Sequence, residues 1–328
     1  MASTVYEQIK SSKQLPSPTG VALEVLRLSQ DPNSTVDEFA GVIEADPALS
    51  SRVLKLVNCP LSGLSRQITS VSRAAALLGV KTVTQLTLGF SLVDNNRKGA
   101  CSAFDYDLFW SESLAVAVAS RHIVNYLKCF PPDEVFTTGL ISQVGRLALA
   151  TAFPEAYANA LYVTPADNPR ELADIEEAVF SINHCALAAE MMADWHVPVV
   201  FQRAVRAQLE PDTHELEPDS RPHLLARILN LAASIASILP TLTVHREGLT
   251  ELTIKAHRLG IPPDVYPQVF DSISEEWREA STIYSVHTRR VPSLAEIYSQ
   301  ARMCQRASEM RPGQLTEEDV SEGRYVRG

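Results

Sequence analysis

Apolar residues recur at the three- and four-residue spacing of a helix along nearly the whole chain. Val21, Val25 and Leu28 show this spacing in the first such segment, and no convincing strand alternation is found elsewhere. The sequence therefore predicts an all-α protein. The expected helices cover residues 21–28, 36–43, 47–57, 71–78, 82–93, 109–127, 134–153, 170–194, 199–208, 224–239, 247–259, 263–286 and 293–310.

Residues that favour a helix start precede several of these segments. Thr35 and Glu38 have the spacing of a capping box, and Ser293 and Glu296 repeat it near the end of the chain. Asp46-Pro47 combines an N-cap residue with proline at the first helical position. These signals fix where the helices begin better than the periodicity does.

A polar segment over residues 95–103, which contains Gly99, separates two groups of expected helices. We therefore predict one helical bundle over residues 1–103, a second over 104–245 and a helical C-terminal extension over 246–328. The last residues, 311–328, are polar and are expected to fray. The predicted architecture is two packed helical bundles followed by this extension.

Composition is that of an ordinary globular protein, with 45% hydrophobic and 21% charged residues. The formal net charge of −10 disfavours non-specific binding to nucleic acid and to anionic membranes. The five cysteines are widely spaced and form no Cys-x-x-Cys pair, so neither a disulfide framework nor a cysteine zinc site is indicated.

No segment has the pattern of a signal peptide or a membrane span. Residues 1–13 lack an apolar core. The longest apolar stretch, 224–244, is interrupted by Arg227 and Asn230 and contains Pro240, so we predict a buried core helix there. The expectation is a cytoplasmic protein with no membrane partner.

The order and spacing of several short segments resemble the HDOD family, an all-α relative of the HD phosphohydrolases. The resemblance covers roughly residues 15–240 and implies an HDOD-specific N-terminal bundle followed by a degenerate HD-like bundle. The segments that carry it are Ile43–Leu49, Arg52–Asn58, Gly63-Leu64, Ile68–Val71, Ala74–Gly79, Phe109-Trp110, Gly139–Ile141 and Gly145–Leu147.

The same resemblance locates the positions of the metal ligands in HD hydrolases. Glu112 stands where the first histidine is expected, and Ser142-Gln143 replaces the His-Asp doublet. The closing aspartate falls near Ala233 or Ser234, and no His-Asp dipeptide occurs anywhere in the chain. A catalytic metal needs about three protein ligands. The resemblance therefore implies a lost metal site, no cofactor and no enzymatic activity.

One histidine of this region is retained. His184 matches a histidine found in many relatives, whereas Gln208 stands near the place of a later histidine. Three roles are open for His184: a structural hydrogen bond, a ligand pocket and a metal contact. In the second case His184, Gln143 and Arg146 would bind a small anionic ligand.

Basic residues cluster mildly in the N-terminal half. Arg52, Lys55 and Arg66, together with Asn58, form a candidate interaction surface, for which a solvated helix face is the alternative.

The function that the resemblance favours is a bacterial signal-transduction module. It would act through contacts with signalling proteins and would regulate behaviour such as motility, biofilm formation or nucleotide second-messenger signalling. The rivals are a sensor for a small anion, a phosphoesterase with unusual ligands, and a helix-turn-helix over Val71–Leu92. Only Arg73, Lys81 and Gln85 support the last, so nucleic acid is not the expected partner.

Overall fold

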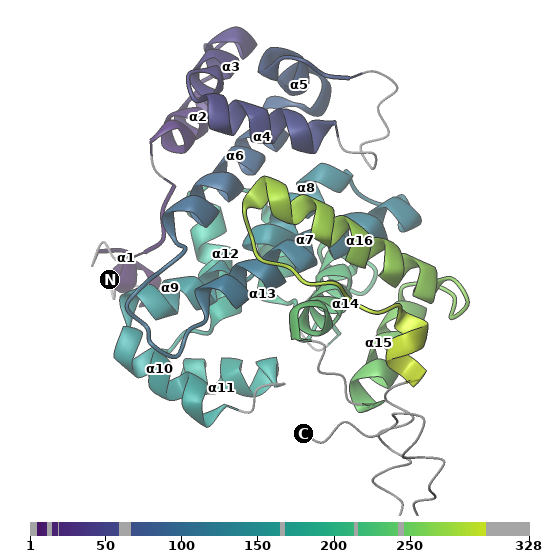
Figure 1. The fold of residues 1–328 in the computed structure, drawn as a ribbon. Helices are drawn as coiled ribbons and strands as arrows, with labels where there is room; N and C mark the ends of the chain where they lie inside the picture. The colour runs from purple at the N-terminus through teal and green to yellow at the C-terminus, as the bar shows by residue number, and fades with distance from the viewer. Residues whose placement is uncertain are drawn as a thin grey trace, which may run out of the picture.

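The computed structural model describes residues 5–11, 15–18, 20–58, 67–164, 168–212, 216–241 and 246–299. Within these ranges every regular element is an α-helix, which confirms the all-α prediction (Figure 1). The helices are α1 (Val5–Ser11), α2 (Val21–Gln30), α3 (Val36–Glu44), α4 (Pro47–Val57), α5 (Val71–Leu78), α6 (Val80–Asn95), α7 (Tyr106–Leu127), α8 (Pro132–Ile141), α9 (Val144–Ala152), α10 (Pro154–Val163), α11 (Pro169–Phe180), α12 (His184–Asp194), α13 (Val199–Arg206), α14 (Arg221–Thr241), α15 (Arg246–Arg258) and α16 (Tyr266–Tyr284).

Helices α2 to α5 pack together at one end of the molecule, and α6 runs from them into the rest of the protein (Figure 1). The predicted capping box of Thr35 and Glu38 starts α3, and the Asp46 carboxylate accepts two backbone N–H groups at the start of α4. Between α5 and α6 the chain bends by 119° at Gly79, whose φ is +89°. Glycine adopts this left-handed conformation without strain.

Helix α7 is the centre of the larger bundle and packs against α8, α14 and α16. Its small residues Ala115, Ala117 and Ala119 are buried, as the sequence suggested for close helix packing. A side chain at Gly139 of α8 would come within 2.9 Å of the Ala117 Cα, so α7 and α8 touch through their backbones here.

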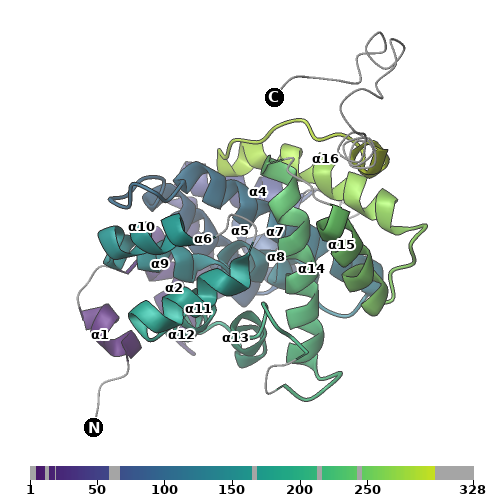
Figure 2. The ribbon, with the colours of Figure 1, turned by 90° about the horizontal axis from the view of Figure 1, so that it is seen from below.

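The apolar stretch that includes Pro240 forms α14, which packs between α7, α13 and α15. Its length and hydropathy would suit a membrane span, but 61% of the apolar window is buried inside the protein. Figure 2 shows α15 lying alongside it. The expectation of a core helix agrees with this packing.

The C-terminal extension is integrated into the fold rather than docked loosely. The Trp277 indole on α16 is fully buried and donates to the Ser111 carbonyl of α7 at 3.0 Å. The Tyr284 ring stacks on Phe90 of α6 with centroids 4.5 Å apart. The Arg97 guanidinium donates to the Tyr284 carbonyl at 2.8 Å. Helix α16 therefore contacts elements on both sides of the predicted boundary at residue 103, and the division itself stays a prediction.

Two expected helices are each broken into a pair. The one predicted over 134–153 ends at Ile141 and restarts at Val144, and the one over 170–194 is interrupted at residues 181–183. Ser181 has a φ of +56°, and the Asn183 side chain caps α12 by accepting from the Ala186 N–H. The apolar periodicity continues through both breaks, so it did not reveal them.

Helix α1 was not predicted. Its Tyr6 and Ile9 are buried, and the Tyr6 hydroxyl and Lys10 ammonium both bind Asp194 of α12. Although it belongs to residues 1–103, α1 lies away from α2 to α5 (Figure 1). At the other end, residues 294–299 are helical and the Ser293–Glu296 capping box is present. The rest of the helix expected to residue 310 lies outside the described residues, as does 311–328.

Candidate functional site

The residues at and around the expected metal-ligand positions come from several elements of the larger bundle. Glu112 lies on α7, and Ser142 and Gln143 form the break between α8 and α9. Arg146 follows on α9, and His184 is the first residue of α12. With Gln208 after α13, we call these six residues the vestigial site.

Arg146 and Glu112 face each other in this site. The Arg146 Nη1 atom lies 3.4 Å from the Glu112 Oε2 atom, and the two side chains are 26% and 24% exposed. Burial raises the pKa of Glu112, although the Arg146 guanidinium works in the opposite direction. The position of the first metal-binding histidine thus holds a carboxylate that is paired with a protein cation.

His184 is fixed by a carboxylate that the sequence analysis did not single out. The Glu176 Oε2 atom accepts from the His184 backbone N–H at 2.7 Å and lies 2.6 Å from its Nδ1 atom. The other carboxylate oxygen accepts the Tyr157 hydroxyl at 3.0 Å. His184 and Glu176 are almost completely buried. Glu176 lies in an acidic run, 171–177, whose other charges gave no sign that one of them turns inward.

Electrostatics favour a charged pair here. Burial opposes the imidazolium form, but Cys185 and the Glu176 carboxylate outweigh it and raise the pKa of His184 to about 10. Burial likewise opposes ionisation of Glu176, yet its contacts with His184 and Tyr157 lower the pKa of that carboxyl. The geometry supports the structural role for His184, because both ring and backbone are engaged at the start of α12.

The backbones of α9 and α12 approach each other closely at Gly145 and His184. A Cβ atom added at Gly145 would lie 1.9 Å from the His184 carbonyl oxygen. Glycine therefore lets α9 rest directly on the first turn of α12, and the break at Ser142-Gln143 sets the direction of α9.

Gln143, at a position that the resemblance assigns to a metal ligand, and Gln208, near the place of a later histidine, bind each other and the backbone. The Gln208 Nε2 atom donates to the Ser142 carbonyl at 3.0 Å, and the Gln143 Nε2 atom lies 3.4 Å from Gln208 Oε1. The Asn230 amide of α14 donates to the Gln208 carbonyl at 2.7 Å. These amides connect three helices without providing metal ligands.

The place of the closing aspartate also lies next to a cation. The Lys255 ammonium of α15 donates to the Ser234 hydroxyl at 2.7 Å and pairs with Glu251 at 2.8 Å. Ala233 is only partly buried against the core. Through Lys255, the C-terminal extension therefore places a positive charge next to Ser234 of α14.

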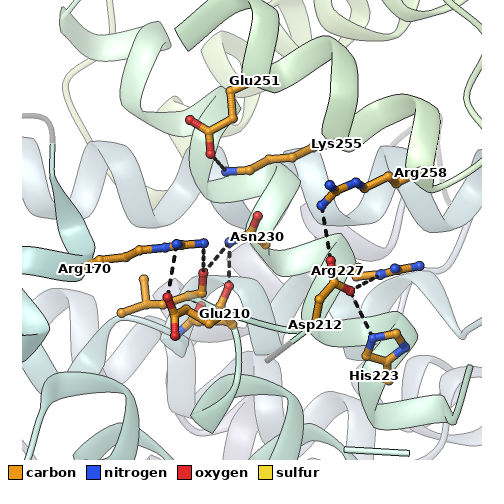
Figure 3. A network of polar contacts seen from close by, with 11 residues as sticks. Arg170, Glu210, Asp212, His223, Arg227, Asn230, Glu251, Lys255 and Arg258 are labelled. Atoms are coloured by element: carbon orange, nitrogen blue, oxygen red, sulfur yellow. Dashed lines mark hydrogen bonds and ion pairs between the residues drawn. The ribbon is translucent and has the colours of Figure 1, made fainter. Parts of the chain in front are cut away.

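A separate group of polar contacts near Lys255 joins α14, α15 and the segment after α13 (Figure 3). Asp212 accepts from Arg227 at 2.8 Å and Arg258 at 3.2 Å, and its Oδ1 atom lies 3.2 Å from His223 Nε2. Burial opposes ionisation of Asp212, but these contacts lower its pKa. Neither the apolar periodicity nor the residue types around His223 indicated this network.

The residues present do not fit the metal that the HD resemblance implies. Among the described residues, no group of three or more His, Cys, Asp or Glu side chains could hold a metal ion. The carboxylate at the first ligand position is already paired with Arg146. We therefore derive no chemical step through a metal here.

The residues of the candidate interaction surface differ in how far they are engaged within the protein. Arg52 is ion-paired with Asp94, and the Asn58 side chain accepts from the Ile68 N–H at 2.7 Å and donates to its carbonyl at 2.7 Å. Lys55 is exposed, and Arg66 lies outside the described residues, as do Gly63-Leu64. Of the residues behind the helix-turn-helix alternative, Gln85 is only 6% exposed and so does not present its amide to a base.

Comparison with known proteins gives relatives of the same fold. The chain is 34% identical to the MmoQ response regulator of Methylococcus capsulatus, covering 78% of this chain and 98% of that one with a TM-score of 0.45. A provisionally named phosphohydrolase of Shewanella amazonensis is 21% identical, with a TM-score of 0.60 and coverage of 86% and 97%.

An uncharacterised protein of Treponema pallidum (strain Nichols) is 22% identical over 213 residues, which make up 63% of this chain. The match spans only 39% of that relative's length. The family model of the HDOD domain matches residues 15–211, which include α2 to α13 and all six residues of the vestigial site. Because this match extends over more than half of the chain's residues, the chain belongs to the HDOD domain family.

Proposed function

We propose that this protein is a non-catalytic signal-transduction module that acts through contacts with other proteins. Family membership supports a role in signalling, and one relative of 34% identity is named a response regulator. Another relative of the same fold carries a provisional hydrolase name, so the catalytic alternative must be weighed on this chain's own residues.

The observation that carries the proposal is the presence of protein cations beside positions that the resemblance assigns to metal ligands. Arg146 pairs with Glu112 at 3.4 Å, and Lys255 binds Ser234 at 2.7 Å. A divalent ion placed beside a guanidinium or an ammonium group would be repelled by it, and it would find amides and hydroxyls instead of imidazoles. The same contacts hold α7, α9, α14 and α15 together, which suits a rigid scaffold.

The catalytic question is settled by metal analysis and a phosphodiesterase assay on the full chain. We expect no metal in stoichiometric amount, and no hydrolysis of bis(p-nitrophenyl) phosphate with added manganese, iron or zinc. The matched control is Glu112→Gln, which removes the only carboxylate at a former ligand position. Hydrolysis by the wild type that Glu112→Gln abolishes would contradict the non-catalytic proposal.

The contact proposal is tested with the chain fused to a biotin ligase in its own host. Lys55 is exposed on α4 and is the described member of the basic cluster without an ion pair. We expect Lys55→Glu to remove labelling of at least one protein that the control Lys98→Glu retains, because Lys98 is also exposed but lies outside α4. Identical labelling by both variants would exclude this surface.

A second candidate, a sensor for a small anion, draws support from the partial exposure of Arg146. Its guanidinium is available to an anion only when Glu112 releases it. His184 is fully buried and bound to Glu176, so we omit it from this pocket and retain Gln143 and Arg146. Stabilisation by phosphate or a nucleotide that Arg146→Gln abolishes would support the sensor.

A further inference from the structure

A cavity lies between α1 and α12, on residues that play no part in the vestigial site. It has a volume of about 260 Å³ and exists because α1 leaves the N-terminal bundle to pack on the far end of α12. Tyr6 and Lys10 come from α1, and Met191, Asp194 and Trp195 come from α12 and its C-terminus. Leu15, Pro16 and Ser17, in the segment after α1, complete the wall.

The polar end of this cavity has an unused hydrogen-bond acceptor. The Tyr6 hydroxyl and the Lys10 ammonium both bind the Oδ2 atom of Asp194, the latter at 2.6 Å. No described residue donates to the other oxygen, Oδ1, although a carboxylate can accept about four hydrogen bonds. Burial opposes ionisation of Asp194, but Lys10 and Tyr6 lower its pKa, so the carboxylate is charged at neutral pH.

Charges of both signs surround this carboxylate: Glu7 and Glu190 are acidic, but Arg206 pairs with Glu190, and His196 together with Lys10 lowers the pKa of Asp194. Burial and the Asp194 carboxylate raise the pKa of the Tyr6 hydroxyl, and the carboxylates of Glu7 and Glu190 raise it further. Lys10 is the cation that contacts the carboxylate, and it is 47% exposed. Because Oδ1 belongs to a charged carboxylate, a ligand that brings a positive charge to it is favoured over an anion.

Apart from the exposed Ser17, the remaining walls are apolar and limit the size of the ligand. Met191 and Trp195 are 1% and 8% exposed, and Leu15 is half-buried. A volume of about 260 Å³ falls below the roughly 300–1,000 Å³ of pockets for drug-sized ligands and cofactors. The cavity therefore suits a small molecule with one apolar group rather than a nucleotide.

We propose that this cavity binds a small primary amine that carries an apolar side group and is about the size of an amino acid. The ammonium group donates to Asp194 Oδ1, and the apolar group lies against Leu15, Met191 and Trp195. An amino acid adds a carboxylate, to which the Lys10 ammonium can donate through its other N–H groups. Binding joins α1 to α12 more firmly and so stabilises the folded chain.

The test is thermal unfolding of the full chain with three probes at millimolar concentration and constant ionic strength. L-leucine and 3-methylbutylamine share the amine and the apolar group, and N-acetyl-L-leucine keeps the apolar group but lacks the ammonium. We expect L-leucine to raise Tm and N-acetyl-L-leucine to leave it unchanged. 3-Methylbutylamine should also raise Tm, except where binding needs the contact between Lys10 and the amino-acid carboxylate. Asp194→Asn should weaken binding by about tenfold or more, because a charged hydrogen bond is lost.

Two further variants separate binding from folding. Asp264→Asn removes an exposed carboxylate on the loop before α16 and should bind the amines as the wild type does. Leu15→Trp keeps Asp194 but fills the cavity, so it should lose the response even if Asp194→Asn proves too unstable to measure. The proposal is overturned if no amine raises Tm, if N-acetyl-L-leucine raises it equally, or if Leu15→Trp responds like the wild type.

Discussion

At the residue scale, the vestigial site contains a buried histidine that a single carboxylate holds in place. His184 is held by Glu176 through one ring nitrogen and its own backbone N–H, with both side chains almost fully buried. Such a pair contributes little net stability compared with apolar residues, but removal of one partner leaves an uncompensated buried charge. The pair therefore specifies how α11 meets α12.

Substitution of Glu176 by glutamine tests this directly. We expect Glu176→Gln to lower the free energy of unfolding by about 3–5 kcal/mol, because the imidazolium loses its counter-charge in a buried position. The control is Asp174→Asn, an exposed carboxylate on the same helix, which should cost less than about 0.5 kcal/mol. Urea unfolding followed by circular dichroism measures both, and equal losses would contradict the buried-pair interpretation.

The pH dependence of stability follows from the same pair. The pKa of His184 is raised to about 10 from an ordinary value of 6.5, so the folded state holds a proton that the unfolded chain releases. Its contribution is complete below pH 6.5 and is lost as pH rises toward 10. Between pH 6.5 and 10 the free energy of unfolding of the wild type should therefore fall as pH rises. Its slope should be steeper than that of His184→Gln by up to about 1.4 kcal/mol per pH unit. Parallel curves for the two proteins would show that His184 is not charged.

At the element scale, α16 is the helix that ties the extension to the rest of the fold. Trp277 lies fully buried against α7, and Glu276 binds the buried guanidinium of Arg121 on that helix. The Arg121 side chain also lies over the Phe136 ring of α8 at 4.5 Å. These contacts make α16 part of the core of the HD-like bundle.

Truncation of the indole should therefore destabilise the whole chain. We expect Trp277→Ala to cost about 3–5 kcal/mol, because it leaves a cavity and removes the hydrogen bond to Ser111. Glu279→Ala, an exposed change on the same helix, serves as the control. Differential scanning calorimetry would detect the loss, and a Tm for Trp277→Ala equal to that of the control would mean that α16 is peripheral.

At the scale of the whole molecule, the helices form a connected structure rather than a string of separate units. Helix α6 packs on both α2 and α8, and α16 packs on both α4 and α7. Contacts of this kind cross the predicted boundary at residue 103 and favour unfolding in one step.

Unfolding by urea should accordingly give one transition, with the same midpoint by circular dichroism and by tryptophan fluorescence. All three tryptophans, Trp110, Trp195 and Trp277, lie after residue 103, whereas circular dichroism reports on every helix. A first transition seen by circular dichroism alone would instead show that residues 1–103 unfold independently.

The sequence by itself determined the helical class and the cap residues. Those features depend on local periodicity, on side chains that bond to a backbone within three residues, and on which residue types are present. Thr35 and Asp46 illustrate this, because their caps are formed as predicted. The apolar character of α14 was equally visible before its packing was known.

Only the tertiary structure decided which polar groups meet. Glu176 turns inward from an acidic run, Lys255 reaches Ser234 from the extension, and α1 crosses to α12. Each contact depends on which face of a helix is buried and on where the chain breaks, as at Ser181 with its positive φ. Periodicity cannot show such choices, because the free energy that fixes them comes from packing between segments distant in the sequence.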